Sequence, residues 1–325
     1  MNKILLVERI HQAGEGMLAE KAELVYPKPQ NLEGILAVIG DCNALVVRNT
    51  KITRQIMEAA PKLAVIGRHG VGYDTVDIAA AADLGIQVVY TPAANTESVA
   101  EISMGFIILL GRKIVEAHSA MQSEELLSDT VTMAIMTRQK GLISADLWGK
   151  TLGVIGVGRI GSTVSKRMHA AFNMRVLGYD PYVDAEKLAR YSVQKMERLE
   201  EMLPQCDFVV VHCSGGAETR HLINARTLAL MKPGTYLINT ARGTIVDEAA
   251  LIDALKRKQI AGAAIDVYKP EPPRPGNPLL HMENVIVTPH FCAMTEESLY
   301  NMATMVAQGV LDVLEGRQPQ YPVDP

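Results

Sequence analysis

Short apolar runs separated by helix-like segments recur along the chain and predict two units in which strands and helices alternate. In the first hundred residues the apolar runs fall at 4–7, 45–47, 63–66 and 87–89, with helical patterns at 54–60 and 76–84. Continuous apolar runs of this length are typical of strands buried on both faces, as in parallel sheets. The long, proline-free stretch 98–115 predicts a helix that crosses from the first unit to the second.

The alternation restarts at residue 152 and continues almost to the end of the sequence. Six further strands are predicted at 152–155, 174–179, 208–211, 236–239, 263–265 and 285–287. Helical segments separate most of them, as the crossovers of a doubly wound parallel sheet require. The last segment, 295–314, is helical and has no strand of its own to accompany, so we expect it to return and pack on the first unit.

A glycine-rich turn follows the first strand of the second unit. Gly156, Gly158 and Gly161 have the spacing G-x-G-x-x-G, and a helix-like run follows them. The first glycine permits a tight turn, the second lets backbone N–H groups approach a pyrophosphate, and the third lets the helix pack closely on the strand. The next strand ends at Asp180, whose carboxylate can accept hydrogen bonds from both ribose hydroxyls. This arrangement predicts a dinucleotide site.

Three chemically useful side chains follow three successive strands of the same unit. Arg242 comes after strand 236–239, Glu271 after strand 263–265 and His290 after strand 285–287. Each alone is more often structural, but α/β sheets place ligands at this edge. A guanidinium can bind a carboxylate or carbonyl, an imidazole can donate a proton, and a carboxylate can orient the imidazole and stabilise its charged form. The set suits reduction of a 2-keto acid.

These residues carry a resemblance to a known family. From the stretch Arg-His-Gly-Val-Gly-Tyr-Asp at 68–74 to the final helix, the chain resembles the D-isomer-specific 2-hydroxyacid dehydrogenases. The resemblance implies that Arg242, Glu271 and His290 are the catalytic residues and that NAD is the cofactor. It also implies NAD contacts from Gly156, Gly158, Arg159, Ile160, Gly161, Asp180, Thr240 and Asp266. The Asp266 carboxylate would bond the nicotinamide amide.

The first unit resembles the part of these enzymes that binds substrate. The loop Gly70-Val71-Gly72 resembles the family's cradle of backbone N–H groups for the substrate carboxylate. Three basic residues are expected near this loop: Arg48, Lys51 and Arg68. Two roles are open for them: they bind a phosphate or second carboxylate of the substrate, or they are surface charges. We place Arg48 among the candidate substrate ligands.

The pattern of strands and helices, together with the family resemblance, gives the expected fold and assembly. We expect two doubly wound parallel-sheet α/β domains: a Rossmann NAD-binding domain, 98–294, inserted into a discontinuous flavodoxin-like substrate domain, 1–97 and 295–325. The resemblance implies a homodimer formed through the NAD-binding domains. The apolar segments 98–115 and 121–136 are the expected contact, since closed two-fold assembly is common.

The chain departs from the family's usual pattern in three places. Phe291 and Cys292 follow the histidine where small residues are common, and we read Cys292 as a small apolar wall residue because no base besides His290 is evident. The segment 212–216, His-Cys-Ser-Gly-Gly, replaces an apolar-Pro pair beside the expected adenine pocket. The segment 113–147 is about ten residues longer than usual by family comparison, and its methionines fit packing better than metal binding.

Composition limits the partners and compartment. The chain has 325 residues, a net charge of -4 and no basic cluster, which argues against nucleic acid or an anionic membrane as the main partner. Its four cysteines form no C-x-x-C pair, so a reducing cytoplasm is expected. No set of His, Cys and Asp residues has zinc spacing, and no metal is expected.

Three alternatives to a 2-hydroxyacid dehydrogenase remain at this stage. A non-enzymatic NAD-sensing protein, of which the family offers a corepressor example, could keep all three catalytic residue types. Formate dehydrogenase shares the fold, but members with that activity pair the histidine with Gln, whereas this chain has Glu271. A lyase or hydrolase would need a catalytic Lys, Cys or metal that we do not find.

Overall fold

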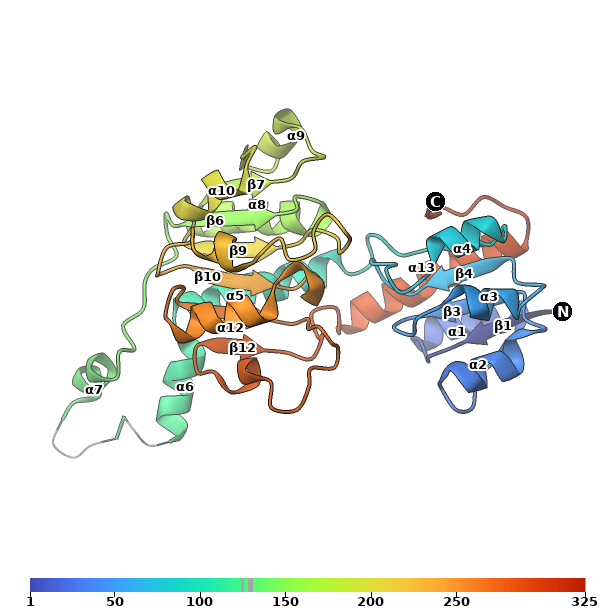
Figure 1. Cartoon of the computed structure of the whole chain (residues 1–325), viewed down its shortest axis with the longest axis horizontal. Coiled ribbons are helices and arrows are strands. Elements are labelled where there is room, and N and C mark those ends of the chain that lie inside the picture. The colour runs from blue at the N-terminus through green and yellow to red at the C-terminus, as the bar shows by residue number, and fades with distance from the viewer. Residues whose placement is uncertain (124–125, 128–130, 325) are drawn as a thin grey trace. The chain divides into compact units, whose positions relative to one another are not determined.

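The computed structural model describes residues 1–123, 126–127 and 131–324 and divides the chain into two compact domains (Figure 1). The first domain comprises Met1–Ser98 and Ala293–Pro325, and the second comprises Val99–Cys292. Among the described helices, none combines the length and the apolar character that crossing a membrane would need.

The first domain is built on a five-stranded parallel sheet. Its strands are β1 (Asn2–Leu6), β2 (Ala22–Val25), β3 (Ala44–Val47), β4 (Val65–Arg68) and β5 (Gln87–Val89). They lie in the order β2-β1-β3-β4-β5, and every pair is parallel. This is the flavodoxin-like strand order, as predicted.

Helices cover both faces of this sheet. They are α1 (Gln12–Ala19), α2 (Leu32–Ile39), α3 (Arg54–Glu58), α4 (Ile78–Asp83) and α13 (Glu296–Leu314). Buried side chains of α2, α3 and α4 pack on one face, and those of α1 and α13 pack on the other. Val306 and Val310 of α13 lie beside Gly67 of β4, where an added Cβ would come within 2.8 Å of both side chains. The prediction that the last helix returns to the first domain is therefore confirmed.

The second domain is built on a seven-stranded parallel sheet. Its strands are β6 (Thr151–Ile155), β7 (Arg175–Tyr179), β8 (Val193–Lys195), β9 (Phe208–Val211), β10 (Tyr236–Asn239), β11 (Gly262–Ile265) and β12 (Val285–Val287). The order is β12-β11-β10-β9-β6-β7-β8. Counted from β6, this is the Rossmann order 3-2-1-4-5-6 with a seventh strand added beyond the sixth, so the predicted fold class is confirmed.

The helices of the second domain precede these strands or connect them. They are α6 (Ile114–Gln122), α7 (Met133–Gln139), α8 (Arg159–Phe172), α9 (Ala185–Ala189), α10 (Leu199–Met202), α11 (Ala225–Leu228) and α12 (Glu248–Lys256), with short 3-10 turns η1 (Leu203–Gln205), η2 (Gly243–Ile245) and η3 (Pro278–His281). Helices α10, α11 and α12 pack on one face of the sheet, while α8 lies against β6 and β7. The chain enters this domain within α5 (Thr96–Gly111).

The predicted helix 98–115 is not continuous, and this part of the prediction was wrong. Helix α5 ends at Gly111, Lys113 has a left-handed φ of 51°, and α6 begins at the next residue. A Cβ at position 111 would lie 2.6 Å from a methyl group of Leu147, so a larger residue here would displace that side chain. The Lys113 ammonium donates to the Gly141 carbonyl at 2.7 Å, which ties the break to the segment beyond α7.

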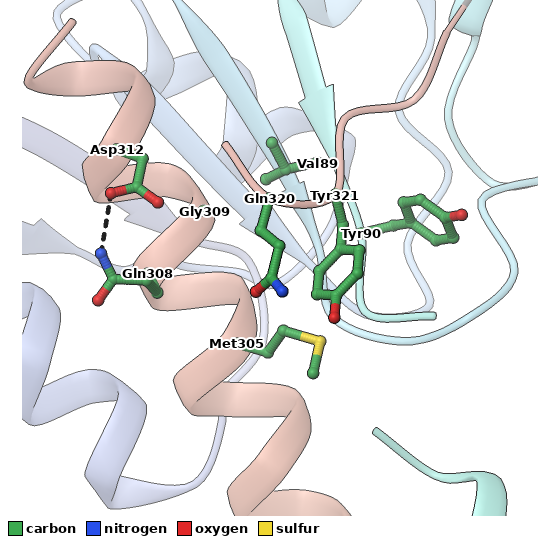
Figure 2. Close-up of a pocket in the computed structure, with 8 residues that line it drawn as sticks. All are labelled: Val89, Tyr90, Met305, Gln308, Gly309, Asp312, Gln320 and Tyr321. Carbon is green, nitrogen blue, oxygen red and sulfur yellow. Dashed lines mark hydrogen bonds between the residues drawn. The ribbon is translucent and has the colours of Figure 1, made fainter. Parts of the chain in front are cut away.

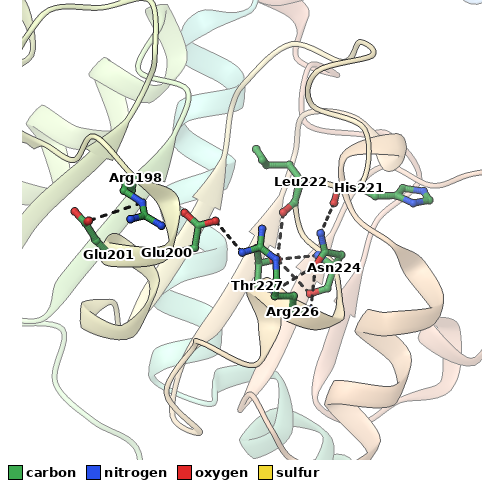
Figure 3. A network of polar contacts seen from close by, with 8 residues as sticks. All are labelled: Arg198, Glu200, Glu201, His221, Leu222, Asn224, Arg226 and Thr227. Atoms are coloured by element: carbon green, nitrogen blue, oxygen red, sulfur yellow. Dashed lines mark hydrogen bonds and ion pairs between the residues drawn. The ribbon is translucent and has the colours of Figure 1, made fainter.

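Polar contacts fix the long connection between β9 and β10 (Figure 3). Asn224 caps α11 by accepting hydrogen bonds from the backbone N–H groups of Arg226 and Thr227, and the Thr227 hydroxyl accepts the Asn224 N–H. Arg226 reaches Glu200 of α10 at 2.9 Å. Such a reciprocal cap satisfies backbone N–H donors that a four-residue helix would otherwise leave without a partner. It therefore fixes the point at which the loop after β9 enters α11.

Candidate active site

The glycine-rich turn after β6 has the geometry of a phosphate-binding loop. Gly156 has a φ of +86°, and a Cβ there would lie 2.5 Å from the Cys213 nitrogen. A Cβ at Gly161 would lie 2.2 Å from the Gly156 carbonyl oxygen, so α8 can approach the turn only with glycine at this position. Gly158 caps α8, and a Cβ there would meet nothing within 4 Å. The space above the helix N-terminus is thus available to an anion.

The other predicted members of this loop lie at the start of α8. Arg159 is exposed and Ile160 is half-buried, and they are the first two residues of the helix. An exposed guanidinium at a helix N-terminus adds positive charge where an anion would bind.

Asp180, at the end of β7, is bound to the backbone of this turn. Its carboxylate accepts the Val157 N–H at 2.8 Å and the Tyr182 N–H at 3.0 Å. The Tyr182 hydroxyl donates to Glu218, in the loop after β9. Two carboxylates, Asp180 and Glu218, therefore border the same tyrosine, and further acceptor positions on Asp180 remain for ribose hydroxyls.

At the end of β10, the predicted Thr240 and Arg242 sit in a turn that Asn239 organises. The Asn239 amide donates to the Arg242 carbonyl at 3.0 Å, and its oxygen accepts the Ala241 N–H at 3.1 Å. Arg242 is half-buried, and its guanidinium donates to the Ala241 carbonyl at 2.7 Å. A Cβ on Gly215 would lie 2.9 Å from the Arg242 side chain, so the unusual 212–216 segment packs against this arginine.

Thr240 belongs to a small buried polar cluster. Its hydroxyl contacts the Ser103 hydroxyl at 3.2 Å and the His212 ring at 3.4 Å. Burial lowers the pKa of His212 to about 4, so its ring is neutral at neutral pH. His212 therefore acts here as a neutral hydrogen-bonding group.

The structure brings Glu271 and His290 together. His290 Nδ1 lies 2.7 Å from Glu271 Oε1, and the His290 and Glu271 side chains are 44% and 39% exposed, respectively. Because a carboxylate can only accept, Nδ1 carries the proton of this bond and Nε2 faces away from it. His290 has a φ of 52°, an uncommon conformation for a residue with a side chain.

The buried Asp266 carboxylate, which is predicted to contact the cofactor, forms hydrogen bonds with residues of its own domain. It accepts hydrogen bonds from Thr288, Phe291 and Cys292. Cys292 is buried, and burial raises the pKa of its thiol well above the ordinary value, as expected for a packing residue and not for a nucleophile.

In the first domain, the loop after β4 carries the predicted carboxylate cradle. Gly70 has a φ of +144°, and its N–H donates to the Arg68 carbonyl at 3.0 Å. The N–H groups of Val71 and Gly72 have no acceptor among the residues that the structure describes. Two of the three predicted donors of this cradle are thus open to a ligand.

His69 was not predicted as part of this site. Its side chain is 1% exposed, and neither ring nitrogen has a hydrogen-bond partner in the described part of the chain. Burial, together with the charges of Arg48 and Arg68, lowers the pKa of His69 to about 3. A buried polar group without a partner is unusual and marks this end of β4 as a place where a ligand group could be bound.

Glu8 also escaped prediction, and it anchors the loop that carries Arg48. Its carboxylate accepts the backbone N–H groups of Arg48 at 2.9 Å, Asn49 at 3.0 Å and Thr50 at 2.8 Å. It thereby fills the nest of N–H groups at the end of β3. Arg48 can therefore offer a ligand its guanidinium but not its backbone, whereas Lys51 beyond it is exposed.

A small hollow in the first domain lies away from these residues (Figure 2). It encloses about 60 Å³ and is lined by Val89, Tyr90, Met305, Gln308, Gly309, Asp312, Gln320 and Tyr321. Gln308 donates to Asp312 at 2.9 Å across one side of it. None of the predicted site residues lines this hollow.

The strand order, the glycine turn and the strand-end residues together define a dinucleotide-binding dehydrogenase fold. Residues 104–292 match the family described as D-isomer specific 2-hydroxyacid dehydrogenase, NAD binding domain, and the chain belongs to this family.

Several relatives are similar over nearly all of the chain. The D-3-phosphoglycerate dehydrogenase of Methanocaldococcus jannaschii is 41% identical over 317 residues, which is 97% of this chain and 58% of that protein. The human D-3-phosphoglycerate dehydrogenase is 39% identical over 98% of this chain and 57% of its own length. The chain thus spans somewhat more than half the length of these curated relatives.

Solved structures match the whole chain. The TT0316 protein of Thermus thermophilus has a TM-score of 0.88 at 32% identity, covering 99% of this chain and 100% of that one. An NADPH-dependent glyoxylate/hydroxypyruvate reductase from Sinorhizobium meliloti has a TM-score of 0.85 at 28% identity, covering 99% and 96%.

Proposed function

We propose that this protein is an NAD-dependent dehydrogenase that interconverts a small D-2-hydroxy acid and its 2-keto acid. The observation that carries the proposal is the pair of Glu271 and His290, 2.7 Å apart, in the loops that follow β11 and β12. These loops leave the carboxyl edge of the same sheet whose β6 leads into the glycine turn. Ligands bind at this edge in doubly wound sheets.

Each group of the proposed site has a separate role in reduction of the keto acid. NADH, when bound, supplies the hydride that reaches the carbonyl carbon. His290 donates the accompanying proton from Nε2 to the carbonyl oxygen, so the keto acid becomes the hydroxy acid with its charge unchanged. Glu271 accepts the Nδ1 proton in a hydrogen bond and orients the ring for the transfer. Arg242 binds the substrate carboxylate or carbonyl through its planar fork of donors.

We assign the first domain to substrate recognition. The open N–H groups of Val71 and Gly72 suit a carboxylate, and Arg48 offers a charge for a second anionic group. The curated relatives are named D-3-phosphoglycerate dehydrogenases, which makes a phosphorylated keto acid the first candidate for that second group.

Turnover across a panel of keto acids tests the proposal. NADH oxidation would be followed with glyoxylate, pyruvate, hydroxypyruvate, 2-ketobutyrate, oxaloacetate and phosphohydroxypyruvate. We expect at least one to be reduced and to form the D-isomer of its hydroxy acid. NADH binding without turnover on any member would favour the NAD-sensing alternative, and NAD reduction by formate alone would favour formate dehydrogenase.

We expect a preference for NADH over NADPH of about tenfold or more in kcat/KM. Asp180 would face the 2′-phosphate of NADPH, and like charges at close range are costly. Glu218, held by Tyr182, adds a second negative charge at this rim. Initial rates with both cofactors give the ratio of kcat/KM for NADH to kcat/KM for NADPH, and Asp180→Ser should lower this ratio. Comparable values for the two cofactors in the unmodified enzyme would contradict this role of Asp180.

We also propose a homodimer formed through the second domain. Helices α6 and α7 expose Ile114, Met121, Met133 and Ile135, an apolar set that isolated surface helices rarely carry without a partner. Residues 124–125 and 128–130 of the predicted contact segment lie outside the described part of the chain.

Light scattering at micromolar concentration should give twice the 35.4 kDa mass of one chain. Ile135→Glu combined with Met133→Glu should shift the mass toward one chain, because two buried charges oppose association. Tyr300→Glu, at an exposed position of α13 in the first domain, is the matched control and should leave the mass unchanged. A single-chain mass for the unmodified protein would overturn the proposal.

A further inference from the structure

Three of the five residues in the turn 288–292, which carries His290, are bound to one buried side chain. The Asp266 carboxylate is 1% exposed and follows β11 directly. Its Oδ1 accepts the Thr288 hydroxyl at 2.5 Å and the Phe291 N–H at 2.7 Å, and its Oδ2 accepts the Cys292 N–H at 3.2 Å. Three of its roughly four acceptor positions are therefore filled from within the turn.

The backbone of the same strand end completes the attachment. The Thr288 N–H donates to the Ile265 carbonyl at 3.0 Å, and the His290 N–H donates to the Asp266 carbonyl at 2.8 Å. Residue 289 is proline and has no backbone N–H that needs an acceptor. Each backbone N–H of 288–292 is thus accepted by Ile265 or Asp266.

This attachment explains the conformation of His290. A residue with a Cβ costs about 1 kcal/mol or more in the left-handed region and stays there only when its surroundings determine it. The bonds to Asp266 flank His290 on both sides, at Thr288 and at Phe291. They fix the direction in which the imidazole leaves the turn, and with it the 2.7 Å contact to Glu271.

We infer that Asp266 is a positioning residue for His290, holding the 288–292 turn so that the imidazole keeps its bond to Glu271. The turn thus takes three of the roughly four acceptor positions of the carboxylate and leaves one for the nicotinamide amide. The inference rests on the proposed function for its effect on turnover, but its structural part can be measured without turnover.

The chain contains its own reporter of this turn. Cys292 is 4% exposed and donates its N–H to Asp266, so loosening the turn exposes its thiol. Cys206, within the second domain, and Cys42, in the first, are fully buried and report unfolding of their own domains. Labelling by iodoacetamide, resolved by peptide mass spectrometry, follows all three thiols in one sample, since only opened segments react.

Asp266→Asn is the main test. The amide NH₂ would face an N–H donor of the turn, so at least one of the three bonds is lost and two donors oppose each other. We expect Cys292 to be labelled about tenfold faster or more, while Cys42 and Cys206 keep their slow rates. kcat for the keto acid should fall on the order of tenfold or more, with the Kd for NADH changed less than about threefold.

Thr288 supplies a matched pair of variants. Thr288→Val removes one bond to Asp266 and should raise Cys292 labelling by a smaller factor, whereas Thr288→Ser keeps the hydroxyl and should restore the slow rate. These variants carry the test if Asp266→Asn also exposes Cys42 and Cys206 and therefore does not fold. Slow Cys292 labelling in Thr288→Val, equal to that of Thr288→Ser, would then overturn the inference.

A double-variant cycle separates positioning from general support of the fold. Glu271→Gln should lower kcat for reduction in the unmodified background and have little further effect on kcat in Asp266→Asn, because the pair is already separated there. The inference is overturned if Asp266→Asn keeps Cys292 protected but weakens NADH binding tenfold or more, which would indicate a cofactor contact. Absence of turnover in the unmodified enzyme would remove the proposed function and leave the labelling result intact.

Discussion

Replacing His290 by alanine should lower kcat for keto-acid reduction on the order of a hundredfold or more at every pH, the usual scale for a positioned proton donor. The carbonyl oxygen must gain a proton as hydride reaches the carbon, and no second group is assigned to give it. The Kd for NADH, measured by fluorescence titration, should change little. His281→Ala is the matched control, because His281 is exposed in η3 of the same domain and should retain full activity.

The companion variant Glu271→Gln should behave differently from His290→Ala. Glutamine keeps the size and a hydrogen-bond acceptor for Nδ1 but removes the negative charge beside the imidazole. The orientation of the ring is largely kept, so kcat for reduction should fall by about tenfold, less than in His290→Ala. The pair is more than a third exposed, so solvent screening limits the contribution of the charge. A kcat equal to that of the unmodified enzyme would show that the two residues are not coupled.

Replacing Arg242 should produce the other large loss. Arg242→Lys keeps the charge but removes the planar fork, so we expect kcat/KM for the keto acid to fall by about a hundredfold. In Arg242→Ala, kcat/KM for the keto acid should fall further, by about a thousandfold, because a substrate carboxylate loses its charged partner. The stability of the domain should change little, since the turn is held mainly by Asn239.

The control for Arg242 is another arginine of the same domain. Arg257 follows α12, is exposed and pairs with Asp253, so Arg257→Lys should keep full kcat/KM. Steady-state rates with the best keto acid of the panel, together with thermal unfolding of each variant, supply the comparison. An Arg242→Lys enzyme with unchanged kcat/KM would remove the arginine from the proposed site.

Strands that read as apolar runs were predictable, and two edge strands with polar positions were not. β3 and β9 are central in their sheets and consist of apolar residues throughout, and the short edge strands β5 and β12 were also marked by apolar residues. β2 and β8 lie at the sheet edges and contain Glu23, Gln194 and Lys195, so their sequences lack a recognisable run. An edge strand is partly solvated, and where its exposed positions are polar the apolar run that marks a strand is lost.

The candidate site was predictable where a local motif or a strand end marked it. The glycines of 156–161 and the residues after β10, β11 and β12 could be found because parallel strands end at a common edge. Glu8, which binds a loop 40 residues away, and the enclosure of Asp266 by a turn beyond β12 could not be found. Such contacts join segments that are distant along the chain, and a single sequence gives no measure of their approach.

The position of α13 has a consequence for synthesis on the ribosome. This helix covers one face of the first sheet, yet all of Val99–Cys292 must be translated before its first residue exists. The apolar side chains of β1, β3 and β4 on that face therefore have α1 but not yet α13 to cover them while the inserted domain emerges complete. Because domains fold as units while the chain grows, the second domain finishes folding before the first. The amino-terminal sheet is then the part of the nascent chain that chaperones have to protect longest.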